Sequence, residues 1–327
     1  MDWTFEPVAG PFEFTEGPVW HPSEAVVSFS DIPTSRILRY DPASDECTEW
    51  ATDTNRGNGS ALGPDGRLYN CEMGTNGNGH QISRYDRNGE RTVLVHEYNG
   101  RRLNSPNDLA FDSLGRLWFT DPDYDDQDDL ELDHFSVYYL DPAGDPGDAA
   151  PDDWEVTRAI DDTTNPNGLV LSKDEGTLYV AESPYGRDTT RELRAYPIDD
   201  GGSRDEASDE SGDEDKDGDG DGAEDVAVGE YEVLHDFGPH RGIDGMCLTD
   251  EGNVVATAGW EESGPGGLLY VFTPEGRVLE THPYPGDRPT NCAFGGEELT
   301  TLYASGFDGY LYRAETDRVG YPVPPSS

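Results

Sequence analysis

The strongest constraint on the fold is a pattern that occurs six times along the chain. Each copy starts with a polar residue, continues with small or apolar residues, turns at Gly, Asp or Pro, and ends in a second apolar stretch. A third apolar stretch follows most copies, at residues 37–42, 82–89, 137–142, 193–201 and 268–276. The copies begin at Glu16, Asn58, Asn107, Asn167, Asp244 and Asn291. Each unit is therefore expected to be a small antiparallel meander.

The spacing of these copies predicts a propeller. Successive copies begin 42, 49, 60, 77 and 47 residues apart, against about 40 to 50 residues for a four-stranded blade. The two long intervals contain Asp-rich insertions, at 122–154 and 199–225. Neither end of the repeat array has a polar cap, which favours a closed ring over an open solenoid. We therefore predict an all-β, six-bladed β-propeller of four-stranded antiparallel blades, with residues 1–327 in one domain.

Two further expectations concern the ends and the insertions of this propeller. Residues 3–8 are expected to add a strand to the last blade, because a ring is closed by pairing its two ends. The segment 201–225 is almost entirely Asp, Glu, Gly and Ser, so it is expected to be a disordered acidic insertion.

The six leading residues of the repeat are expected to meet. The first strand of every propeller blade lines the central channel, so residues at equal phase lie at equal height. All six side chains carry oxygen: Glu16, Asn58, Asn107, Asn167, Asp244 and Asn291. Asn and Asp also favour turns, which is the plain structural explanation, but a turn preference does not account for six matches.

Such a ring would be a hard-oxygen site for one divalent cation. Ca²⁺ is the first choice, because it accepts irregular sets of neutral and charged oxygens, with Mg²⁺, Mn²⁺ or Zn²⁺ as alternatives. A bound dication polarises carbonyls and activates water, and ester-like bonds are the natural target. Asp244 is the candidate general base or acid. A carboxylate bound to a dication is a weaker base, so the alternative is that Asp244 orients the water.

A second group of carboxylates is expected near the ring, at the ends of the second strands. These residues are Asp31, Glu72, Asp121 and Glu182. They either brace the ring residues, as outer partners of metal ligands often do, or only start turns.

Five stretches in register at blade spacing resemble one family. They are EGPVW from Glu16, RLNSPNDLAFDSLGRLWFTDP from Arg102, NPNGLVLSKDEGTLYVAES from Asn165, GIDGMCLTDEGN from Gly242, and PTNCAFGG from Pro289 with LYAS from Leu302. Together they resemble the senescence marker, gluconolactonase and luciferin-regenerating enzyme family, over residues 12–313. The resemblance implies a six-bladed propeller that hydrolyses sugar lactones with a divalent metal.

By position, the resemblance implies roles for individual residues. Glu16, Asn167 and Asp244 would be metal ligands, and Asp244 would also accept and donate the proton. Asn107 would contact metal or substrate, and we assign Asn58 and Asn291 to the same substrate-binding ring. The chain departs from the family pattern at Met73, where many bacterial members carry His after a Cys-Glu pair, and at Ser105, where animal members carry Arg. These departures leave the particular lactone open.

The charge of the chain excludes some partners. Asp and Glu number 69 against 22 Lys and Arg, a net charge of −47, so neither nucleic acid nor an anionic membrane is an expected partner. Aromatic residues make up 10% of the chain, which argues against general disorder. A folded protein coated with carboxylates is typical of organisms with a salt-rich cytoplasm, such as haloarchaea, because high ionic strength screens the repulsion. No signal peptide or apolar span is present, so we expect a cytoplasmic protein.

Other motifs narrow the chemistry. The four cysteines are widely spaced and are expected to be buried free thiols. Residues 213–224 match a calcium-loop expression, but they lack flanking helical patterns and are interpreted as a solvated acidic loop. No serine-nucleophile elbow, zinc-protease, Walker or dinucleotide motif occurs.

Three functions remain open at this point. The first is a metal-dependent lactonase that opens a sugar lactone to its aldonic acid. The second keeps the site but acts on another ester or on an organophosphate. The third is a propeller used as a binding module with a structural axial ion.

Overall fold

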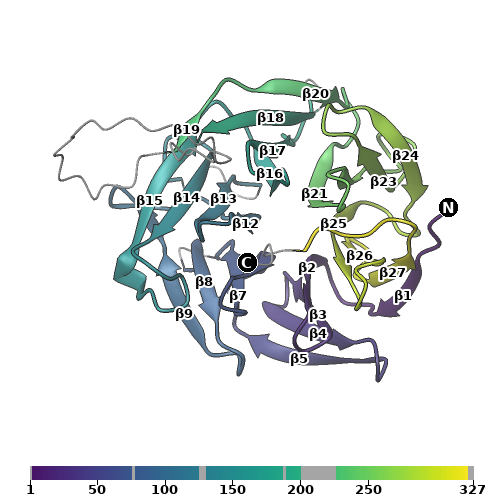
Figure 1. Ribbon diagram of the computed structural model, residues 1–327, viewed down its shortest axis with the longest axis horizontal. Helices are drawn as coiled ribbons and strands as arrows, with labels where there is room; N and C mark the ends of the chain where they lie inside the picture. The colour runs from purple at the N-terminus through teal and green to yellow at the C-terminus, as the bar shows by residue number, and fades with distance from the viewer. Residues whose placement is uncertain (1, 76–77, 125–129, 187–188, 200–225, 323–327) are drawn as a thin grey trace, which may run out of the picture.

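Six antiparallel sheets follow one another round a ring in the computed structural model (Figure 1), which confirms the six-bladed β-propeller. The structure describes residues 2–75, 78–124, 130–186, 189–199 and 226–322. The chain runs once round the ring, and the first strand of each blade faces the axis, as Figure 1 shows for β2, β16 and β21.

The first three blades run from the purple to the blue-green part of the ring in Figure 1. Blade 1 consists of β2 (Thr15–His21), β3 (Val26–Asp31), β4 (Arg36–Asp41) and β5 (Glu46–Thr52). Blade 2 consists of β6 (Gly57–Leu62), β7 (Leu68–Glu72), β8 (Gln81–Tyr85) and β9 (Arg91–Val95). Blade 3 consists of β12 (Leu109–Phe111), β13 (Leu117–Asp121), β14 (Ser136–Pro142) and β15 (Trp154–Ile160).

The other three blades complete the ring. Blade 4 consists of β16 (Pro166–Leu171), β17 (Thr177–Glu182) and β18 (Glu192–Asp199), with β19 (Ala227–Val228) and β20 (Glu232–Asp236) sharing its outer edge. Blade 5 consists of β21 (Ile243–Leu248), β22 (Val254–Ala258), β23 (Leu268–Phe272) and β24 (Val278–Pro283). Blade 6 consists of β25 (Pro289–Gly295), β26 (Thr301–Gly306), β27 (Leu311–Glu315) and β1 (Glu6–Ala9).

The structure refines the sequence-based expectation for the insertions. Blade 4 has five strands instead of four, because β19 and β20 both pair with β18. The interval 122–154 contains β14 and the short 3₁₀ helix η1 (Pro151–Asp153), so much of it belongs to blade 3. A hairpin of β10 (Glu97–Tyr98) and β11 (Arg101–Arg102) stands outside the six blades. The acidic segment 201–225, with its calcium-loop match, lies outside the described residues.

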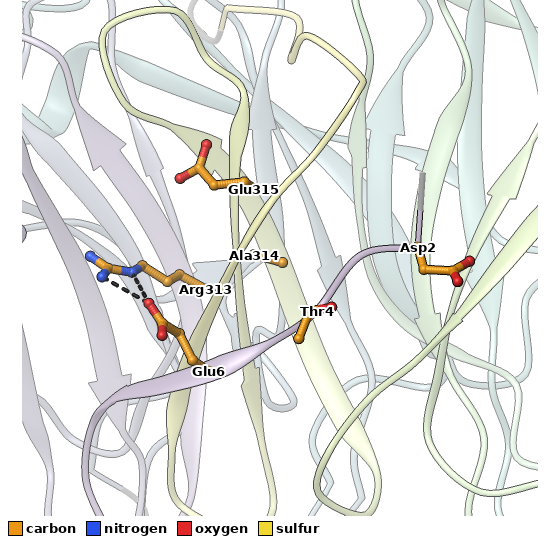
Figure 2. Close-up of a pocket in the computed structure, with 6 residues that line it drawn as sticks. All are labelled: Asp2, Thr4, Glu6, Arg313, Ala314 and Glu315. Atoms are coloured by element: carbon orange, nitrogen blue, oxygen red, sulfur yellow. Dashed lines mark hydrogen bonds and ion pairs between the residues drawn. The ribbon is translucent and has the colours of Figure 1, made fainter.

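The N-terminal strand closes the ring, as the sequence predicts. β1 pairs antiparallel with β27, so the first and last parts of the chain share blade 6. Trp3 is buried beside it and stacks on His282 with ring centroids 3.9 Å apart. A surface hollow at this closure is lined by acidic residues and by Arg313, which already pairs with Glu6 (Figure 2). The hollow lies on outer strands and does not contain any of the ring residues, so we do not assign function to it.

The core lies between neighbouring blades. The second strands β7, β13 and β22 are buried along their whole length, because each is covered by a blade on both faces. Their sequences are accordingly rich in apolar and aromatic residues, as expected for strands without a solvated face. No described helix is long and apolar enough to cross a membrane. All four cysteines are free, and the Sγ atoms of Cys247 and Cys292 lie 3.5 Å apart on neighbouring inner strands.

Candidate metal and active site

The ring residues lie where the inner strands enter the channel, at irregularities of the β-ladder. The pairing register shifts between Glu16 and Val19 in β2, and β6, β16, β21 and β25 show the same shift around Asn58, Asn167, Asp244 and Asn291. A β-bulge bends the strand and redirects the side chain. The repeated bulge therefore explains how residues from five blades turn away from the ladder.

Glycines after the ring residues allow the inner strands to pack closely. Gly17, Gly59, Gly168 and Gly245 each follow a ring residue, and a Cβ atom on any of them would collide with the next inner strand. At Gly168, for example, the added atom would lie 2.3 Å from the main-chain oxygen of Asp244. The Asn-Gly and Asp-Gly pairs of the repeat thus reflect close approach of neighbouring blades around the axis.

The structure brings several of the expected site residues together. Glu16, Asn167, Asp244 and Asn291 are all buried, and the charges of Glu16 and Asp244 act on one another. The Asn167 amide donates a hydrogen bond to the Asp244 carboxylate. That donation leaves the Asn167 carbonyl oxygen as the atom available to a cation.

Asp108 joins this group, although the sequence analysis did not single it out. Its carboxylate accepts a hydrogen bond from the main-chain N–H of Leu109 at 3.0 Å and one from the Asn291 amide at 3.4 Å. Its charge also acts on Glu16. The repeat has Gly at this position in four copies, so an Asp there was the signal that could have identified it.

The main-chain oxygens of Asn58 and Asn107 form hydrogen bonds to the preceding blade at the ring. The oxygen of Asn107 accepts a hydrogen bond from the N–H of Gly59 at 2.9 Å, and that of Asn58 accepts one from the Ser30 hydroxyl at 2.8 Å. Both side chains are buried. The Oδ1 atom of Asn58 has no hydrogen-bond partner among the described residues, which is costly unless a ligand satisfies it.

Burial raises the pKa values of all three carboxyl groups. Burial, followed by the charges of Asp244 and Asp108, raises the pKa of Glu16 well above its ordinary value. Burial raises the pKa of Asp108 to about 7, against the opposing hydrogen bonds from Leu109 and Asn291. Burial also raises the pKa of Asp244, and the Arg241 guanidinium opposes this effect. Buried carboxyl groups whose charges act on one another are an arrangement that a cation would stabilise.

Arg241 is the second residue that the sequence analysis missed. Its guanidinium contacts the Asp244 carboxylate and donates to the main-chain oxygen of Pro289 at 2.9 Å. The signal was weak, because a single Arg in a Gly-rich loop does not distinguish a site residue from a surface residue. The structure shows that its side chain is only 17% exposed.

The donor set fits a divalent cation. Glu16, Asp108, Asp244 and the Asn amides offer only hard oxygen atoms, which suit Ca²⁺, Mg²⁺ or Mn²⁺. Among the described residues, no three His, Cys, Asp or Glu side chains form a ready metal cluster. The expected ligand set differs from such a cluster, because it combines two carboxylates with amide oxygens.

The carboxylates at the ends of the second strands brace the loops that lead into the ring. Asp121 accepts the main-chain N–H groups of Asn104 and Ser105 at 2.9 and 2.8 Å, and Glu182 accepts that of Asn165 at 2.6 Å. Asp31 accepts the N–H of Phe14 at 3.3 Å, and Glu72 accepts the Asn55 amide at 2.7 Å. Each contact lies two or three residues before a ring residue, so these carboxylates do more than start turns.

The two departures from the family pattern lie together in space. The Ser105 hydroxyl donates to the main-chain oxygen of Met73 at 3.2 Å, and His80 contacts the main-chain oxygen of Asn104 beside them. Met73 and Ser105, the two residues that depart from the family pattern, therefore lie in contact on loops of the neighbouring blades 2 and 3.

Known proteins of similar sequence and structure agree with this fold. The family model for the SMP-30/Gluconolactonase/LRE-like region matches residues 14–306. A gluconolactonase of Zymomonas mobilis is 29% identical over 319 residues, covering 92% of this chain and 78% of that protein. A pentonolactonase of Haloferax volcanii is 25% identical over 300 residues, covering 90% and 82%. The solved structure of a gluconolactonase from Xanthomonas campestris has a TM-score of 0.73 at 28% identity, covering 96% of this chain and 89% of that chain.

The fold and the site define a six-bladed propeller whose inner strands carry buried side chains with oxygen atoms. The family model spans most of the sequence. The chain therefore belongs to the SMP-30/gluconolactonase/LRE-like family.

Proposed function

We propose that this protein hydrolyses a sugar lactone to its aldonic acid with the help of one divalent cation. The observation that carries the proposal is the burial of Glu16, Asp108 and Asp244, whose charges act on one another, together with the hydrogen bond from the Asn167 amide to Asp244. The two curated relatives named above are a gluconolactonase and a pentonolactonase, which supports a lactone as the substrate class.

Glu16, Asn167 and Asp244 would hold the cation, with Ca²⁺ as our first choice because amide oxygens and an irregular geometry suit it. When bound, a dication polarises a carbonyl and lowers the pKa of water. The protein's own residues would place the lactone against the ring through the Asn58, Asn107 and Asn291 amides. Asp244 would take a proton from the attacking water and return it to the ring oxygen when the acyl bond breaks. The Arg241 contact favours the ionised carboxylate that this role requires.

The test is hydrolysis of a panel of pentono- and hexonolactones in molar KCl, measured as acid release above the spontaneous rate. We expect hydrolysis of at least one lactone, its loss after treatment with ethylenediaminetetraacetate, and its recovery when Ca²⁺, Mg²⁺, Mn²⁺ or Zn²⁺ is returned in excess. Hydrolysis that persists through complete chelation would contradict the metal role. No hydrolysis of any lactone with metal present would contradict the lactonase proposal itself, and would favour an ester, organophosphate or binding function.

A further inference from the structure

A group of aromatic and arginine side chains stands at the channel mouth between blades 5, 6 and 1. Phe14 stacks on Phe307 with ring centroids 4.1 Å apart. The guanidinium of Arg288 lies 4.3 Å from the centre of the Phe307 ring and 5.3 Å from that of Trp260. Aromatic faces hold a guanidinium flat and in place. Arg288 is therefore positioned by two rings.

This group is connected to the ring of acidic residues. The Arg241 guanidinium lies 5.5 Å from the centre of the same Phe307 ring and also contacts Asp244. Phe307, Trp260 and Arg288 all belong to loops at the end of the blades where the inner strands begin. The contacts of Arg241 and Phe307 therefore connect Asp244 to Arg288 without interruption.

The two arginines differ in what they offer to a ligand. Arg241 is occupied, because it contacts Asp244 and donates to the main-chain oxygens of Pro289 and Gly259. In Arg288, Nε is buried and faces Asp287 at 3.4 Å, while the side chain is 36% exposed. Among the described residues, neither terminal nitrogen of Arg288 has an acceptor. Arg288 thus presents an open pair of donors beside the site.

Asp287 only partly offsets the charge of Arg288. Its other oxygen accepts the main-chain N–H of Glu261 at 3.0 Å, which ties the carboxylate to the loop. Asp287 approaches Arg288 at Nε, at 3.4 Å, and the edge formed by the two terminal nitrogens lies opposite Nε. A planar pair of N–H donors of this kind matches a carboxylate, phosphate or sulfonate group.

We propose that Arg288 is an anion-recognition residue, and that the lactone substrate carries a negatively charged group at the end of the molecule remote from the lactone carbonyl. The proposal rests on the proposed function for the identity of the reacting bond. The role of Arg288 in recognition can be tested without hydrolysis, because Arg288 would select charged over neutral ligands of the same shape.

The experiment compares charged and neutral ligands in wild type, Arg288→Gln, Arg288→Lys and Arg87→Gln. Arg87 is exposed in the turn between β8 and β9, so its substitution makes the same change of charge away from the mouth. The substrates are 6-phosphogluconolactone, glucaro-1,4-lactone and gluconolactone, which separate phosphate, carboxylate and neutral forms. Binding of glucitol 6-phosphate and glucitol, which lack the bond that breaks, is measured in parallel by calorimetry. Circular dichroism confirms that each variant folds.

In wild type we expect kcat/KM to favour at least one charged lactone, and glucitol 6-phosphate or the charged lactone to bind more tightly than its neutral counterpart. Arg288→Gln should lower this charged-to-neutral ratio by about 10- to 100-fold, as for loss of a hydrogen bond between charged groups. Arg288→Lys should restore part of it, and Arg87→Gln should leave it unchanged.

An equal ratio in wild type and Arg288→Gln would overturn the proposal, as would a wild type that prefers neutral ligands. If no lactone is hydrolysed but binding still favours the charged ligand through Arg288, the proposed function fails and the recognition role stands. If neutral lactones are hydrolysed without any Arg288-dependent selectivity, the recognition role fails and the proposed function stands.

Discussion

Replacing Asp244 with Asn should lower kcat/KM for lactone hydrolysis by about 10²- to 10⁴-fold, the usual contribution of a general acid or base. The substitution keeps the size of the side chain and removes both its charge and its basic oxygen. Asp244 is buried, accepts the Arg241 and Asn167 hydrogen bonds, and faces the charges of Glu16 and Asp108.

Asp152→Asn is the matched control, because it makes the same change on the exposed η1 helix. We expect it to retain wild-type kinetics. Steady-state rates in molar KCl, with circular dichroism on each variant, provide the measurement. Asp244→Asn with a rate within about threefold of wild type would remove this residue from the mechanism, since a general base contributes at least about 10²-fold.

Transfer from molar to millimolar KCl should destabilise the protein strongly. We propose that the chain is adapted to salt, because a net charge of −47 repels itself when it is not screened. The Debye length rises from about 3 Å at 1 M to about 30 Å at 0.01 M. A loss of several kcal/mol would lower the melting temperature of a chain this long by roughly 5–10 °C.

The measurement is thermal unfolding in a KCl series, repeated with sucrose at low ionic strength to separate charge screening from general stabilisation. A triple variant with Gln at three exposed positions, Glu46, Glu297 and Glu298, should need less salt than wild type. Equal melting temperatures in 20 mM and 2 M KCl would contradict the salt adaptation.

Much of the fold could be predicted because the sequence repeats one structural unit. The residue that leads five of the six copies lies at a bulge of its inner strand, as at Asn58 and Asn167, so the position in the repeat predicted the position in the blade. The edge of blade 4 was harder to predict, since β19 and β20 are short and exposed and follow a long acidic segment. Short exposed strands carry little apolar periodicity.

The site could be predicted only in part, for a physical reason. The sequence repeat identifies residues that occupy equal positions in every blade. It does not identify a site residue that occurs in only one blade. Asp108 replaces a glycine of the repeat, and Arg241 reaches the site from a loop outside the repeat. Arg288 lies against Trp260 and Phe307, and these three residues come from separate loops of the neighbouring blades 5 and 6, which the repeat does not relate to one another.

We propose that oxygen atoms from distant parts of the chain bind one dication, and equilibrium dialysis against Ca²⁺ measures that binding. Molar KCl suppresses loose binding to surface carboxylates, so bound calcium measured by mass spectrometry should count the specific site. We predict one equivalent per chain in wild type and in Asp152→Asn, and almost none in Glu16→Gln, Asn167→Ala or Asp244→Asn. Equal amounts of bound calcium in wild type and in all three ring variants would contradict a single cation site formed by these residues. A wild type that binds no Ca²⁺, Mg²⁺ or Mn²⁺ would contradict it as well.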